Sequence, residues 1–132
     1  MNQPQWVLNE VVLAIHKQQL AEHGGPSGVR DEGLLASALA RPKNLFDYEP
    51  DDASIQRLAA CYAFGLARNH PFLDGNKRVA LVVSLLFLKL NGMDLSAPME
   101  ERYQVFMALA DGGMGEDELS AWFERYCNKL KT

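Results

Sequence analysis

The segment 76–90 constrains the fold most strongly, because it is apolar on nearly every side. Leucine, valine, alanine and phenylalanine fill almost every position from 79 to 88, and Gly92 follows where a helix would end. A helix without a polar face must be buried among other elements of the protein. The apolar block contains Ser84 and is well short of the ~20 residues that span a bilayer, so no membrane span is predicted. The chain therefore needs further elements that surround this helix.

Apolar residues at helical spacing predict five more helices around it. With the central one, the predicted spans are about 9–22, 31–42, 54–69, 76–90, 98–110 and 116–130. Asp31 is suited to cap the second of these helices, and Ser54 or an aspartate before it is suited to cap the third. In the last two, the residues expected to face the core are Tyr103, Phe106, Leu109, Leu119, Trp122, Phe123 and Tyr126. No segment has the pattern of a sustained strand, and 132 residues with 48% apolar composition suit one domain. We therefore predict an all-α, compact single-domain bundle of about six helices over residues 1–132.

The connector 43–50 is unusually apolar for a surface link, since it holds Leu45, Phe46 and Tyr48 between two prolines. Pro42 is expected to end the second helix just before it. Such a connector suits a flap that lies over a pocket. A loop pinned to the core by its aromatic side chains explains the composition equally well, so both interpretations stay open.

Charge and cysteine content limit the partners and the compartment. The formal net charge of −4 argues against general binding to nucleic acid or to an anionic membrane surface. Cys61 and Cys127 both fall in helical patterns, which favours free thiols in a reducing compartment over a disulfide framework. The first residues show no basic segment followed by an apolar run, so no signal peptide is predicted. These observations favour a cytoplasmic protein.

The nine residues from His70 to Arg78, HPFLDGNKR, directly precede the apolar helix. A helix start offers unpaired backbone N–H groups and the positive end of the helix dipole, and both favour an anion. Gly75 permits a tight turn and a close approach of the backbone to a ligand, while Asn76 is suited to cap the helix and fix the loop. Lys77 and Arg78 are consecutive, so their side chains should diverge by about 100° and hold two different phosphate groups. The pattern predicts a phosphate-binding site.

Three further side chains supply what the backbone lacks for chemistry. His70 can accept the proton of a hydroxyl that attacks a phosphorus atom. Asp74 is a single carboxylate that can hold Mg²⁺, whose other ligands would be water and phosphate oxygens. Arg68 adds a third cation just upstream. Together they predict transfer of a phosphate-containing group, with most of the acceleration coming from positioning and charge neutralisation.

Each of these residues also has an ordinary structural interpretation. A lone histidine is commonly structural, a Lys-Arg pair is commonly a solvated helix start, and Gly-Asn is good turn chemistry. Their convergence at one helix end favours the functional interpretation. Other sites have less support, because His16 and His23 form no zinc-binding pattern and Ser84 lacks an elbow motif around it.

The HPFLDGNKR motif closely resembles the signature of the Fic/Doc family, in which Fic members carry HPFx[DE]GNGR and Doc toxins carry HxFxDxNKR. The similarity extends to Gly24-Gly25, to Arg30-Asp31 and to the segment LLFLKLNG that ends at Gly92. The resemblance therefore covers most of the chain, at the minimal size of the Doc toxins. It implies the helical core of the Fic/Doc family.

The resemblance also implies a role for each residue of the motif. His70 would be the base that activates a hydroxyl of a protein side chain, and Asp74 would hold Mg²⁺. The phosphate-binding positions of the family are matched by Gly75, Asn76 and Arg78. Arg68 falls where Doc toxins also place an arginine, two residues before the histidine.

Lys77 decides between two reactions of the family. Typical Fic enzymes have a glycine there, which leaves room for the terminal phosphates, so that attack occurs at the α-phosphorus and AMP is transferred. In Doc toxins the lysine accompanies a reversed nucleotide, and the γ-phosphate of ATP passes to translation elongation factor Tu, which halts protein synthesis. Lys77 thus favours a protein kinase. AMP transfer remains the alternative, because Pro71 and Gly75 are typical of Fic and Val82 stands where the best-known Doc has asparagine.

The resemblance further implies control by a second protein. The self-inhibitory pattern of the family, [ST]xxxE[GN], is not intact, since the nearest stretch, Gly28 to Gly33, lacks the hydroxyl residue. Doc toxins are held by a cognate antitoxin whose C-terminal segment folds as a helix into a groove on the toxin. A toxin of a toxin-antitoxin system is therefore expected. The interpretation from another class is a non-catalytic module that binds an anion or a partner and transfers nothing.

Overall fold

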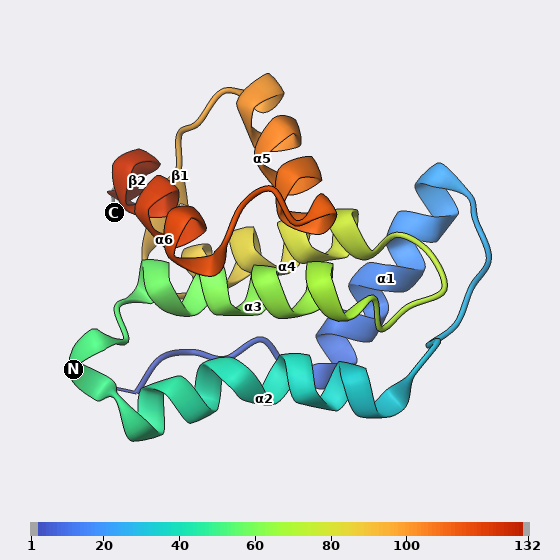
Figure 1. Cartoon of the computed structure of the whole chain (residues 1–132), viewed down its shortest axis with the longest axis horizontal. Coiled ribbons are helices and arrows are strands. Elements are labelled where there is room, and N and C mark those ends of the chain that lie inside the picture. The colour runs from blue at the N-terminus through green and yellow to red at the C-terminus, as the bar shows by residue number, and fades with distance from the viewer. Residues whose placement is uncertain (1–2, 131–132) are drawn as a thin grey trace.

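A computed structural model describes residues 3–130 of the chain, and it is built almost entirely from helices (Figure 1). In chain order the elements are α1 (Asn9–His23), α2 (Glu32–Tyr48), the 3₁₀-helix η1 (Pro50–Asp52), α3 (Ile55–Asn69), α4 (Asn76–Leu90), β1 (Met93–Leu95), α5 (Met99–Asp111), α6 (Glu116–Tyr126) and β2 (Cys127–Lys129). The two strands are only three residues long. The predicted all-α bundle of about six helices is confirmed.

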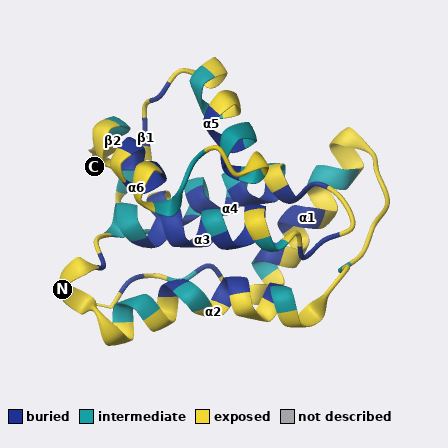
Figure 2. Ribbon diagram, in the orientation of Figure 1, coloured by how far each residue is buried: buried dark blue, intermediate teal, exposed yellow. Residues whose placement is uncertain are grey.

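The core lies where α3 and α4 pack against each other, and α3 is its most buried helix (Figure 2). Helix α3 also packs against α2, α5 and α6, while α4 contacts α1, α5 and β1. Small residues allow these close approaches: a Cβ added at Gly65 would lie 3.2 Å from Ala38 of α2. Helix α4 is largely buried, as expected, but it shares the centre with α3 because several of its leucines are half-exposed.

The helix starts follow the predicted caps. The Asp31 carboxylate accepts a hydrogen bond from the backbone N–H of Leu34 at 2.9 Å, at the start of α2. The Ser54 hydroxyl accepts one from the N–H of Arg57 at 3.1 Å, at the start of α3. These bonds satisfy amide groups that have no partner within the helix.

The segment 43–50 is not a loop, because its first six residues belong to α2. The flap interpretation was wrong, and of the alternative only the packing of Leu45 and Phe46 against the core is confirmed. Helix α2 runs through Pro42 and ends at Tyr48. Pro42 is buried, and the following aromatic residue Phe46 packs edge-on against Trp6, with ring centroids 6.0 Å apart. A proline removes one backbone hydrogen bond from a helix, and here tertiary packing outweighs that loss. No flap over the pocket is formed by these residues.

The predicted helix 116–130 ends early, at Tyr126. Residues 127–129 instead form β2 and pair antiparallel with β1, with Leu95 opposite Cys127 and Met93 opposite Lys129. Three residues are too few to show the alternation that marks a strand, so the sequence pattern could not separate this segment from the helix before it.

Cys61 and Cys127 are both free, as predicted. Cys61 is buried in α3, and this burial raises the pKa of its thiol to about 11, so it remains uncharged at neutral pH. Within residues 3–130, no helix has the length and apolar character required to cross a membrane.

Candidate active site

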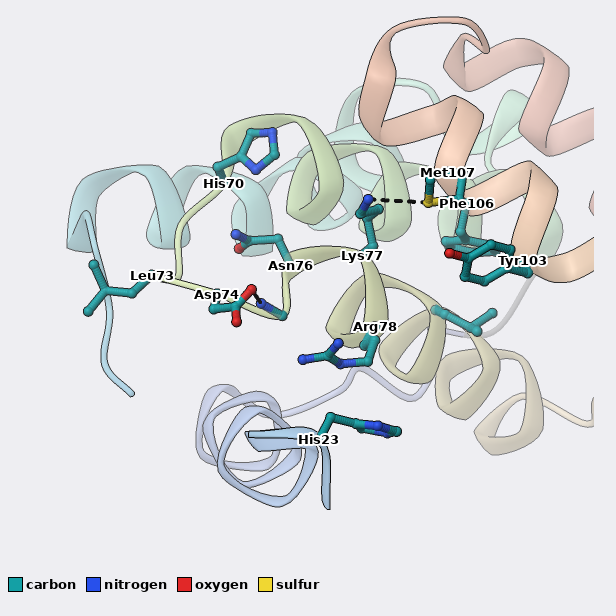
Figure 3. A pocket seen from close by; sticks show the side chains of 12 residues that line it. His23, His70, Leu73, Asp74, Asn76, Lys77, Arg78, Tyr103, Phe106 and Met107 are labelled. Carbon is teal, nitrogen blue, oxygen red and sulfur yellow. Dashed lines mark hydrogen bonds between the residues drawn. The ribbon is translucent and has the colours of Figure 1, made fainter. Parts of the chain in front are cut away.

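A cavity of about 640 Å³ opens at the N-terminal end of α4, between the 70–78 motif and α5 (Figure 3). Most of its lining comes from the motif itself. The lining residues are His23, His70, Leu73, Asp74, Gly75, Asn76, Lys77, Arg78, Leu81, Tyr103, Phe106 and Met107. The structure thus brings all the predicted site residues except Arg68 to one cavity.

His70 follows the last residue of α3 in a left-handed conformation, with φ 48°. Among residues 3–130 it is the only non-glycine residue with positive φ, which costs on the order of 1–3 kcal/mol and marks a constrained position. Arg30 stabilises this turn, because its Nε donates to the His70 carbonyl at 2.7 Å and its Nη2 to the Asn69 carbonyl at 2.9 Å. The exposed imidazole is thereby directed over the cavity edge (Figure 3).

Asn76 fixes the loop but does not cap the helix. Its buried amide bonds both backbone groups of Phe72: Nδ2 donates to the carbonyl at 3.0 Å, and Oδ1 accepts from the N–H at 2.9 Å. The N-cap position belongs to Gly75, at φ 80°, and no side chain caps α4 in the structure. The predicted cap was therefore wrong, because a side chain fully used within the loop cannot also reach the first turn. The amide groups of that turn are left for another acceptor.

Asp74 is the carboxylate of the cavity. Its Oδ1 accepts a hydrogen bond from the Gly75 N–H at 2.8 Å, while the side chain stays exposed. Gly25, at φ 115°, packs so closely that an added Cβ would overlap the carboxylate. No group of three or more histidine, cysteine or acidic side chains that could hold a metal occurs in the part of the chain that the structure describes. A divalent cation at Asp74 would therefore take other ligands from water and phosphate oxygens, which is how Mg²⁺ usually binds.

Lys77 and Arg78 diverge as predicted (Figure 3). The Lys77 ammonium points toward α5 and donates to the Met107 sulfur at 3.2 Å. The half-buried Arg78 guanidinium lies beside Gly75, and its buried Nε has no hydrogen-bond partner among the described residues. An unpartnered buried donor and an uncapped helix start fit an anionic ligand such as a phosphate group.

Arg68, predicted as the third cation, does not line the cavity. Its guanidinium carbon lies 5.4 Å from the centroid of the Phe64 ring, and the head group approaches Gly112 between α5 and α6. The position two residues before the histidine falls on another face of α3. In this structure Arg68 supports the packing of α3 against the α5–α6 turn.

The opposite wall of the cavity is apolar and was missed from the sequence. It is formed by Leu81 of α4 and by Tyr103, Phe106 and Met107 of α5. Tyr103 was expected in the core, but it is 68% exposed at this cavity. Its spacing from Phe106 is helical, so the sequence could place both on one face without showing that the face ends at a cavity.

Comparison with known proteins finds relatives of this chain in one family. The sequence profile of the Fic/DOC family matches residues 6–88, which include the whole 70–78 motif. The chain is 34% identical over 86 residues to the "Protein kinase doc" of Escherichia phage P1, over 65% of this chain and 68% of that protein. It is 40% identical over 77 residues to the "Toxin Doc" of Mycolicibacterium smegmatis, over 58% of this chain and 59% of that protein. On the extent of the profile match and the arrangement of its motif residues, the chain belongs to the Fic/DOC family.

Proposed function

We propose that this protein is a Doc-like toxin that transfers the γ-phosphate of ATP to a hydroxyl of a protein target, with translation elongation factor Tu as the proposed target. The observation that carries the choice of reaction is the position of Lys77. Its side chain spans from the start of α4 to Met107 of α5 and occupies space that a glycine would leave open. The name of the phage P1 relative, a protein kinase, supports the same reaction.

The residues of the cavity divide the work of such a transfer. His70 accepts the proton of the target hydroxyl as its oxygen forms the new bond to the γ-phosphorus, and the bond to ADP breaks. Lys77, Arg78 and the first amide groups of α4 stabilise the negative charge of the phosphates. Asp74 would hold Mg²⁺, which supplies further charge neutralisation when bound. Phosphoryl transfer needs little covalent chemistry from the protein, so the positioning of the reacting groups accounts for most of the rate acceleration.

The test uses ATP labelled at either end of the triphosphate. With purified elongation factor Tu or a cell lysate, we expect the γ-label, and not the α-label, to appear on protein. Lys77→Gly should lose most of this transfer, whereas Lys89→Gly, at the other end of the same helix, should keep it. Protein labelled only from the α-position would refute the kinase proposal.

AMP transfer is the second candidate function, favoured by Pro71 and Gly75, which match the Fic form of the motif. It requires Lys77 to move away from the start of α4. Under this alternative Lys77→Gly strengthens α-label transfer. A non-catalytic binding module, by contrast, would impair cell growth equally with and without His70.

We also propose that a cognate antitoxin restrains the protein by placing a helix in a groove on this toxin. The name of the mycobacterial relative, a toxin, supports this proposal, and the self-inhibitory pattern of the family is not intact in these 132 residues. An apolar helix face laid in a groove is a common mode of peptide recognition. Co-expression with a neighbouring antitoxin gene should restore growth and yield a stable complex, and toxicity unaffected by every such gene would contradict the proposal.

A further inference from the structure

We infer that His16 is a positioning residue for group transfer at this cavity: a buried imidazole of α1 that fixes the peptide group carrying the metal-binding carboxylate. This inference rests on the proposed function and adds a residue to it. His16 is 5% exposed and does not line the cavity, unlike His23 and His70. It lies behind the motif, so it can act only through other residues.

Two contacts join His16 to the motif. Its Nε2 lies 3.1 Å from the backbone carbonyl oxygen of Asp74. Its ring stacks on Phe72, with centroids 3.9 Å apart and planes at 15°. Phe72 is itself fixed by the double hydrogen bond from Asn76. His16 therefore contacts the loop at two residues, Phe72 and Asp74, one on each side of the exposed Leu73.

The bond to Asp74 assigns the proton on His16. A carbonyl oxygen can only accept a hydrogen bond, so Nε2 must carry the hydrogen. Val12 and Ile15 on the same helix are buried, so an apolar residue would satisfy the packing of this face. A donor is needed here because the Asp74 carbonyl points inward from the loop toward α1.

The peptide group that His16 holds also orients the carboxylate. Its oxygen belongs to Asp74 and accepts from His16, and its N–H belongs to Gly75 and donates to Asp74 Oδ1 at 2.8 Å. Gly75 is in turn the N-cap of α4. Loss of the His16 donor would let this peptide rotate, which would shift both the carboxylate and the first amide groups of α4. Groups that orient metal-binding residues in this way typically contribute about 10–100-fold to metal affinity or activity.

Two substitutions separate positioning from packing. His16→Phe keeps a ring to stack on Phe72 but removes the donor, whereas His16→Gln removes the ring and keeps an N–H donor near the position of Nε2. We expect His16→Phe to unfold at a slightly lower temperature than wild type, because the Asp74 carbonyl loses its donor while the ring packing is kept. It should also lose transfer about tenfold and need severalfold more Mg²⁺. His16→Gln should be less stable and retain most of the activity. Activity that follows stability across the two variants would overturn the inference.

Spectra of the ring test the same inference without any transfer. Nitrogen-15 NMR of the wild-type protein, at a pH where the ring is neutral, should show the hydrogen of His16 on Nε2, and a bare Nε2 would overturn the assignment. Hydrogen exchange at the Gly75 amide should accelerate in His16→Phe and not in His16→Gln. If the wild type transfers neither label, the proposed function fails, while these two measurements still decide whether His16 holds the loop.

Discussion

The two walls of the cavity are built differently. The polar wall, residues 70–78, is held along its backbone: Arg30 N–H donates to the Pro71 carbonyl at 2.7 Å, and Leu73 N–H to the Gly28 carbonyl at 3.1 Å. Helix α5 makes side-chain hydrogen bonds through Glu101 and Arg102, but neither residue lines the cavity. Among the described residues, the α5 side chains that do line it have no comparable network, and Tyr103 is largely exposed. A network of hydrogen bonds fixes atom positions, whereas an exposed tyrosine and a flexible methionine side chain can adjust to different contacts. We therefore expect the first wall to position reacting groups and the second to contact ligand groups of varied shape.

Sequence similarity separates the polar wall from the part of the apolar wall that α5 contributes. The Fic/DOC profile ends at residue 88, so it covers the polar wall and the segments that support it but not α5. The part of the chain that matches the family profile therefore includes the residues proposed to carry out the transfer. We expect α5 to influence which ligand or target is bound, and the predictions below test the two walls separately.

The largest effect is expected at His70. His70→Ala should reduce transfer about 10²–10⁴-fold, because it removes the only side chain assigned to accept the hydroxyl proton. His23→Ala is the matched control, since His23 lines the same cavity from α1. Initial rates with the γ-label measure both. Equal losses in the two variants would show that the polar wall does not place a specific base.

Gly25 and Gly24 test how the polar wall is supported. Both have positive φ, so alanine at either position should destabilise the fold by about 1 kcal/mol. Only at Gly25 would the new Cβ overlap the Asp74 carboxylate, since nothing lies within 4 Å of such an atom at Gly24. Gly25→Ala should therefore also lower transfer about tenfold and raise the Mg²⁺ requirement. Thermal unfolding measures the loss of stability in the two variants, and Mg²⁺ titrations measure the effect on the Asp74 carboxylate. Identical Mg²⁺ curves for the two variants would contradict the idea that Gly25 leaves necessary space for this carboxylate.

The polar wall was largely predictable from the sequence, because its signals are local. Gly75 next to a long apolar helix predicts a turn at a helix start, and consecutive residues such as Lys77 and Arg78 must diverge on a helix. The role of Asn76 was only half predicted, since the sequence does not show whether an amide bonds the helix or the loop before it. Arg68 was misplaced because two residues along a helix change the face by about 200°.

Two features could not be predicted, because they depend on contacts between distant segments. They are the residues that support the polar wall, and the apolar wall as a whole. The supporting contacts of Gly25, Arg30 and His16 join residues 39 to 58 positions apart in the sequence. No local spacing reveals such pairs. Tyr103 was assigned to the core because helical periodicity does not show where the core ends. Pro42 misled the prediction of α2 for a related reason, since tertiary packing overrode a local signal.

A smaller effect is expected on the apolar wall. Tyr103→Ala should raise the KM for ATP or for the protein target about three- to tenfold and leave kcat nearly unchanged, because it removes contact area and no charge. Tyr48→Ala is the control, since Tyr48 is 83% exposed at the end of α2, away from the cavity. Steady-state kinetics with each substrate varied in turn identify which of them Tyr103 touches. A fall in kcat at constant KM would place Tyr103 in the reaction itself and remove the distinction between the walls.

The smallest effect concerns the contact that joins the two walls, between Lys77 and Met107. A thioether is a weak acceptor, so Met107→Leu keeps the volume and should change the rate of γ-label transfer only about twofold. Met99→Leu, an exposed position at the start of α5, should change nothing. Because Lys77 is expected to select the transferred phosphate, the ratio of γ-label to α-label is the sharper readout. A shift of this ratio in Met107→Leu, but not in Met99→Leu, would show that the apolar wall helps to place Lys77. An unchanged ratio would show that α4 positions the lysine without help from α5.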